Sequence, residues 1–129
     1  MSFVKIDLTK AKEAEVVPEG EYDLRVVKVT DGETKKKDPM TTLVLRIEDA
    51  AVSNPAPVMH YITYPNGGQY DDMRSLEIKR LLTLFNVAFD RDGFNSEELL
   101  GQTAKCLLVL EEGDDGVVRN RMKLPRIKE

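Results

Sequence analysis

Three cations recur at every second position near the end of the chain: Arg119, Arg121 and Lys123. In a β-strand this spacing places all three side chains on one face. A row of like charges repels itself unless an anion neutralises it, and successive phosphate groups are anions that such a row can contact. The spacing therefore predicts a phosphate-binding strand. The alternative is a solvated face, or one whose cations pair with carboxylates on a neighbouring strand.

Other basic residues lie in the first half of the chain. Lys35, Lys36 and Lys37 form a basic tip between two strand-like runs, and Arg46 lies on the polar face of the second of these runs. A lysine-rich connection beside a binding groove would attract phosphates, although lysine-rich loops also serve only solubility.

Tyrosines supply the flat side chains that stacking on nucleic-acid bases requires. Tyr61 lies in the third strand-like run, Tyr64 at its end and Tyr70 in the following loop. His60 falls on the opposite face from Tyr61 and is expected to be structural or at the rim of a ligand site. The predicted nucleic-acid-binding residues are Lys35, Lys36, Lys37, Arg46, Tyr61, Tyr64, Tyr70, Arg119, Arg121 and Lys123.

Motifs for catalysis or metal binding are not found in the sequence. Residues 90–95 resemble the middle of a calcium loop, but Ala88 and Leu99 occupy two positions where that loop needs ligands. The single cysteine, Cys106, lies in an apolar run, which predicts a buried thiol rather than a nucleophile. We therefore expect no cofactor, no metal and no enzymatic activity.

Length and composition indicate a globular protein. The 129 residues match one domain, and 41% hydrophobic and 33% charged residues exclude the disordered class. The net charge of −4 argues against a protein coated in positive charge. No apolar run has membrane-spanning length and no secretory signal is found near the N-terminus, so we expect a cytoplasmic protein without a membrane partner.

Hydrophobic periodicity predicts three strands, a helix and a closing hairpin. An apolar phase slip after Val26 predicts a β-bulge in the first strand, and a long polar loop is expected over residues 31–39. Residues 1–16 are expected to form an arm or short helix ahead of one domain, residues 17–129. The predicted strands are residues 21–30, 40–49, 57–64, 102–111 and 117–125; the helix runs from 71 to 86 or 87, and a helical turn covers 96–100.

The helix is the element with the clearest apolar stripe. Asp71 and Asp72 are predicted to cap it, and Ser96 to cap the short turn that Gly101 ends. The residues predicted to pack on the sheet are Ile78, Leu81, Leu82, Phe85 and Phe89, whereas Lys79, Arg80 and Thr83 are predicted to point away.

The order of elements predicts a mainly β fold, a five-stranded OB-fold-like Greek-key barrel with one helix between strands 3 and 4. A split α+β sheet is the alternative. The loop between the last two strands, Glu111-Glu112-Gly113-Asp114-Asp115, is acidic where such barrels border their groove. This loop either points away from the bound strand, or gates binding, or the ligand is not nucleic acid.

Four short motifs resemble a phage-encoded family of small OB-fold single-stranded DNA-binding proteins, over residues 17–124. They are Val17-Pro18-Glu19-Gly20-Glu21-Tyr22, Lys37-Asp38-Pro39-Met40, Lys79-Arg80-Leu81-Leu82 and Glu98-Leu99-Leu100-Gly101-Gln102. Proteins of this role often end in an acidic tail that recruits partners, whereas this sequence ends Pro125-Arg126-Ile127-Lys128-Glu129. We therefore do not expect recruitment through such a tail.

The resemblance and the cationic strand together predict a protein that coats single-stranded DNA, with little sequence preference, during phage DNA replication or recombination in the host cytoplasm. Homo-oligomerisation and contacts with viral replication or recombination proteins stay open. The alternative is a non-catalytic interaction or structural module of a viral complex that contacts a partner protein through the acidic hairpin.

Overall fold

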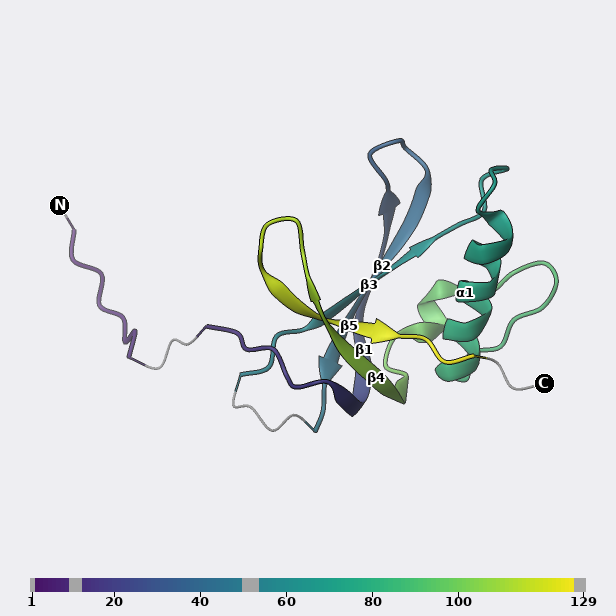
Figure 1. The fold of residues 1–129 in the computed structure, drawn as a ribbon. Coiled ribbons are helices and arrows are strands. Elements are labelled where there is room, and N and C mark those ends of the chain that lie inside the picture. Colours follow the sequence, from purple (N-terminus) through teal and green to yellow (C-terminus); the bar gives the residue numbers. More distant parts are fainter. Residues whose placement is uncertain (1, 10–12, 50–53, 127–129) are drawn as a thin grey trace.

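The computed structural model describes residues 2–9, 13–49 and 54–126 (Figure 1). Within these residues the chain forms five β-strands, one α-helix and one short 3₁₀ helix. Their bounds are β1 Gly20–Glu33, β2 Pro39–Ile47, β3 Val58–Thr63, α1 Asp71–Leu84, η1 Ser96–Leu99, β4 Thr103–Glu112 and β5 Val118–Lys123. The prediction of a mainly β fold with one helix between the third and fourth strands is confirmed.

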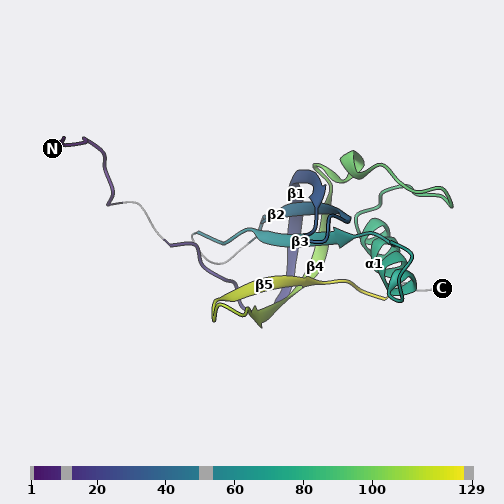
Figure 2. The ribbon, with the colours of Figure 1, turned by 90° about the horizontal axis from the view of Figure 1, so that it is seen from above.

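The five strands form one antiparallel sheet in the order β3-β2-β1-β4-β5. The long strand β1 lies at the centre and pairs with β2 along one edge and with β4 along the other. The two outer strands, β3 and β5, also contact each other, and both views show them side by side (Figures 1 and 2). The sheet therefore curls until the strands at its two edges, β3 and β5, are neighbours.

Strand β1 contains the predicted bulge. Val26 pairs with Leu45 and Lys28 with Val44, so that Val27 has no partner in the β2 ladder. An extra residue of this kind bends a strand and increases its twist. Strand β1 pairs with β2 on both sides of the bulge, but with β4 only before it. The predicted polar loop over residues 31–39 is wrong in extent, because β1 continues to Glu33 and β2 begins at Pro39.

Alternating side chains build a hydrophobic core on the inner face of the curled sheet. Leu24 and Val26 of β1 are fully buried there, and Leu108 of β4 joins them. Helix α1 contributes two buried leucines at positions 81 and 82. The buried side chains of the strands and of α1 thus form one continuous core between the sheet and the helix.

The aromatic residues near the end of α1 differ in their burial. Phe85, the first residue after the helix, is fully buried in the core, as predicted. The core prediction for Phe89 is wrong, because its side chain is 43% exposed. The helix has already ended at Leu84, so helical spacing no longer decides which side chains face the core at position 89.

The ends of the helix differ from the prediction. Helix α1 ends at Leu84 rather than at residue 86 or 87, and Asn86 adopts a left-handed φ of 58°. Tyr70 is the N-cap and makes no side-chain cap bond; the Asp71 carboxylate instead accepts the backbone N–H groups of Asn66 and Gly67. Short polar side chains bond to whichever nearby N–H groups the turn presents, which spacing alone does not reveal.

The short helix η1 is capped by Asn95 rather than by Ser96. The Asn95 Oδ1 atom accepts the backbone N–H of Glu97 at 3.0 Å. Gly101 follows with a left-handed φ of 84°, as expected of a residue that ends the turn.

The segment before β1 is attached to the sheet through Val17. This residue is fully buried, and its backbone N–H and C=O bond to the side-chain amide of Asn120 on β5 at 2.8 and 2.9 Å. The predicted arm, residues 1–16, lies partly outside the described residues; residues 2–9 form no helix or strand. No helix in the described part of the chain is long and apolar enough to cross a membrane.

Candidate nucleic-acid interface

A cleft of about 750 Å³ lies between the outer strands β3 and β5 and reaches helix α1. Strand β3 contributes Met59, His60 and Tyr61 to its walls. The cleft brings together residues more than fifty positions apart in the sequence, because the sheet curls until β3 and β5 meet (Figure 2). Its volume falls within the roughly 300–1,000 Å³ of small-molecule sites, which is room for a nucleotide.

The alternation of β3 decides which of its side chains face outward. Val58 and Ile62 point inward and are buried, opposite Leu45 and Thr41 of β2. Met59 and Tyr61 therefore lie on the outer face, 40% and 55% exposed. An exposed tyrosine beside an apolar methionine provides a flat surface on which a base can stack.

Strand β5 supplies the predicted basic row. Arg119, Arg121 and Lys123 all point outward and all line the cleft, whereas Met122 between them is buried in the core. The predicted division of this strand into a cationic and an inward face is confirmed. Arg119 and Tyr61 line the same cleft. The carboxylate of Asp115 raises the Arg119 pKa most, and Tyr61 acts in the same direction.

Two of these cations are held by carboxylates of the β4–β5 hairpin. Arg119 donates two hydrogen bonds to Asp115, the shorter at 2.7 Å, and Arg121 pairs with Glu111 at 2.5 Å. The Arg119 guanidinium and the backbone N–H of Val117 lower the Asp115 pKa to about 2. Arg119 and Arg121 are therefore paired with carboxylates, which is the alternative that the sequence left open for this strand.

The acidic hairpin borders the cleft. Glu111 and Gly113 line it, so the base of this loop lies on the same cleft as the basic row. Gly113 leaves space for the ion pair, because a Cβ atom there would lie 2.8 Å from Nη1 of Arg119. The hairpin thus places its carboxylates against two cations of the basic row.

Arg80 is a cleft residue that the sequence prediction missed. Instead of pointing away into solvent, this side chain of α1 is half-buried and lines the cleft. Its Nε atom is buried and has no hydrogen-bond partner among the described residues. The sequence does contain a signal for this half-buried position. Arg80 lies next to Leu81 and two residues after Ile78, at the border of the apolar stripe of the helix.

His60 lies half-buried at the cleft, on the inner side of β3. Burial lowers its pKa to about 4, and the nearby charge of Arg121 acts in the same direction. His60 is therefore neutral at neutral pH and adds no positive charge to the cleft. This placement agrees with the expectation that His60 is structural or lies at the rim of a ligand site.

The basic tip lies at the turn of the β1–β2 hairpin (Figure 1). None of its three lysines lines the cleft. Lys35, Lys36 and Lys37 are exposed, and the Lys37 N–H bonds to the Thr34 carbonyl with Lys37 at a φ of 65°. The tip can meet only a ligand that extends beyond the cleft.

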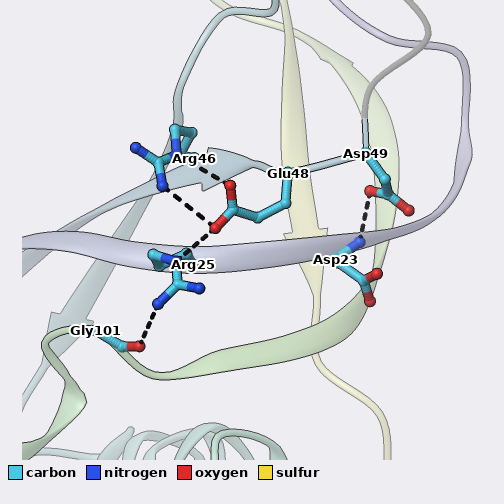
Figure 3. A network of polar contacts seen from close by, with 6 residues as sticks. All are labelled: Asp23, Arg25, Arg46, Glu48, Asp49 and Gly101. Carbon is cyan, nitrogen blue, oxygen red and sulfur yellow. Dashed lines mark hydrogen bonds and ion pairs between the residues drawn. The ribbon is translucent and has the colours of Figure 1, made fainter.

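Arg46 belongs to a separate polar network on the outer face of β1 and β2 (Figure 3). Arg46 and Arg25 both donate to Glu48, and Arg25 also donates to the Gly101 carbonyl at 3.1 Å. Hydrogen bonds from Arg46 and then Arg25 lower the Glu48 pKa. Arg25 therefore links β1 to the end of β2 and to the entry to β4, whereas Arg46 contacts only Glu48 among the described polar groups and lies outside the cleft.

The other two predicted tyrosines are also outside the cleft. The Tyr64 ring packs against Phe94 with centroids 6.3 Å apart, and its hydroxyl bonds with the Thr41 hydroxyl at 2.7 Å. Tyr70 is 52% exposed at the start of α1. Only Tyr61 among the three lies beside the basic row.

Cys106 is buried, as predicted, and burial raises its thiol pKa to about 12. It is therefore a protonated thiol at neutral pH.

Among known proteins, no family model matches this chain and no curated protein is similar to it in sequence.

Proposed function

We propose that this protein binds single-stranded DNA with little sequence preference, and that the cleft between β3 and β5 is the binding site. The observation that carries the proposal is the combination, in one cleft, of the exposed Tyr61 ring and the row Arg119, Arg121 and Lys123. Single-strand binding needs this combination, since bases stack on aromatic rings while cations follow the phosphates.

The topology supports an OB-fold barrel as the scaffold. Its features are a central bent β1 between β2 and β4, contact between β3 and β5, and a helix between β3 and β4. OB-folds bind oligonucleotides on the face of strands 2 and 3, between the loops that follow strands 1 and 4. Tyr61, the lysine tip and the acidic hairpin lie on the corresponding elements of this chain.

The setting in phage DNA replication or recombination rests on the four short motifs that resemble a phage family of this role. The proposed protein would coat the strand without chemistry of its own. Its hairpin carboxylates would leave Arg119 and Arg121 as phosphates arrive, which makes binding weaker than the number of cations suggests.

Binding of fluorescently labelled oligo-dT, followed by anisotropy and gel shift at several salt concentrations, tests the proposal. We expect binding at low salt that weakens as salt rises, because phosphate contacts release counterions. Duplex DNA of the same length should bind more weakly, since its bases are unavailable for stacking on Tyr61. Absence of oligo-dT binding at low salt would contradict the proposal.

A non-catalytic contact with a partner protein of a viral complex is the second candidate. The observation that favours it is the β4–β5 hairpin, where Leu110, Val117 and Val118 are 43–49% exposed beside the acidic residues. Unaltered mobility of oligo-dT in the low-salt gel shift would favour this candidate over DNA binding.

A further inference from the structure

The cations of the cleft fall into two sets at its two ends. Arg119 and Arg121 are paired with Asp115 and Glu111, beside the hairpin. Lys123 at the end of β5 and Arg80 of α1 form no ion pair with any residue that the structure describes. The chain leaving β5 passes close to α1 in both views (Figures 1 and 2), so we call this the helix end of the cleft.

The Arg80 guanidinium contains a hydrogen-bond donor that lacks an acceptor among the described residues. Its Nε–H is buried without a partner among the described residues, and a buried donor without an acceptor is destabilising. Glu77 also lines the cleft, three residues earlier in α1, yet these two described side chains form no ion pair with each other. Two cations against one carboxylate leave the helix end positively charged.

The residues around this end indicate which anion it would take. A guanidinium fork and a lysine ammonium together suit the several oxygens of a phosphate group. Tyr61 and Met59 of strand β3 line the same cleft and offer an apolar surface for a base of the strand that carries this phosphate. A free carboxylate or inorganic anion would leave this surface unused.

We propose that Arg80 and Lys123 bind one phosphate group of the DNA strand at the helix end of the cleft and thereby anchor it. This assignment rests on the proposed function. Unlike the hairpin end, the helix end needs no ion pair among the described residues to break before the phosphate binds.

Salt-dependent binding of oligo-dT to the full-length variants Arg80→Ala and Lys123→Ala tests the anchor. Each variant should weaken binding about ten-fold at low salt, and the slope of log K against log salt should become shallower by about 0.7 for each phosphate group that is no longer neutralised. Arg80→Lys should keep the slope but lose part of the affinity, because it retains the charge and lacks the Nε donor. Lys79→Ala is the matched control, since this exposed neighbour on α1 does not line the cleft.

The outcomes separate the anchor from the proposed function. If Arg80→Ala and Lys123→Ala bind with the affinity and slope of Lys79→Ala, the anchor assignment is wrong while DNA binding stands. If the unaltered protein binds no oligo-dT, both the anchor assignment and the proposed DNA binding are wrong. Should Arg80→Ala fail to fold by circular dichroism, the exposed Lys123→Ala variant decides, and an unchanged slope there overturns the anchor.

Discussion

Tyr61 is the side chain on which a base would stack, because it is exposed and lies beside the cations of β5. Replacing it with alanine should weaken oligo-dT binding by about 1–3 kcal/mol, the usual contribution of one stacked base. Fluorescence anisotropy with labelled oligo-dT measures the change. Tyr61→Phe, which keeps the ring, should bind nearly as well as the unaltered protein.

Tyr70 provides a comparison with Tyr61, since it is 52% exposed but lies outside the cleft. Tyr70→Ala should leave the affinity close to that of the unaltered protein. An equal loss in Tyr61→Ala and Tyr70→Ala would remove the reason for placing the base in the cleft.

His60 makes stability depend on pH. Its pKa is about 4 in the folded protein and 6.5 ordinarily, so the unfolded chain binds a proton between these values that the folded protein does not. Protonation of His60 leaves the free energy of unfolding unchanged well above pH 6.5. It lowers this free energy by about 3 kcal/mol as the pH drops to the folded-state pKa. Urea unfolding at neutral pH and near the folded-state pKa measures it.

The matched variant is His60→Gln, which cannot titrate. It should lose less stability than the unaltered protein over the same pH interval, while carboxylates contribute equally to both. Since the chain has a single histidine, its imidazole NMR signals also report the pKa directly. A measured pKa equal to that of an exposed histidine would contradict the half-buried placement beside Arg121.

In the proposed function, the β4–β5 hairpin would compete with DNA phosphates for Arg119 and Arg121, with which its carboxylates form ion pairs. Asp115→Asn should release Arg119 and tighten oligo-dT binding several-fold at low salt, with a steeper dependence on salt. Anisotropy titrations at a series of salt concentrations measure both effects.

Asp114→Asn is the control for this experiment. It removes the same charge from the same hairpin, but Asp114 forms no ion pair with any of the described residues. Equal tightening in both variants would mean that net charge, and not release of Arg119, is responsible.

The hydrophobic core joins α1 and the residue that follows it to the sheet. Phe85 is fully buried in the core, so Phe85→Ala should lower the free energy of unfolding by about 3–5 kcal/mol. Phe89→Ala should change it by only about 0.5 kcal/mol, because that ring is 43% exposed. Urea denaturation compares the two; similar losses would contradict the position of Phe89.

The overall charge of the molecule does not favour the proposed binding of an anionic strand. The net charge is −4, so any attraction for DNA must come from the local arrangement in the cleft. Cleft residues come from β3, β5, α1 and the β4–β5 hairpin, and none of these elements forms the site alone.

Much of the architecture could be predicted from the sequence because it depends on local patterns. Alternation located the strands, the phase slip after Val26 located the bulge, and period two placed Arg119, Arg121 and Lys123 on one face. The helix was found from its apolar spacing, but its end and its cap were not. Helix ends depend on which nearby groups accept or donate hydrogen bonds, as the Asp71 and Asn95 side chains illustrate.

By itself, the sequence determined the order of the elements and the alternation of side chains along the strands, since both follow from the chemistry of neighbouring residues. Only the tertiary structure decided which faces meet. It paired Arg119 and Arg121 with hairpin carboxylates, brought Arg80 to the cleft, and left Arg46, Tyr64 and Tyr70 outside it. The physical reason is the curl of the sheet, which brings β3 to β5 through long-range strand pairing that no local pattern encodes.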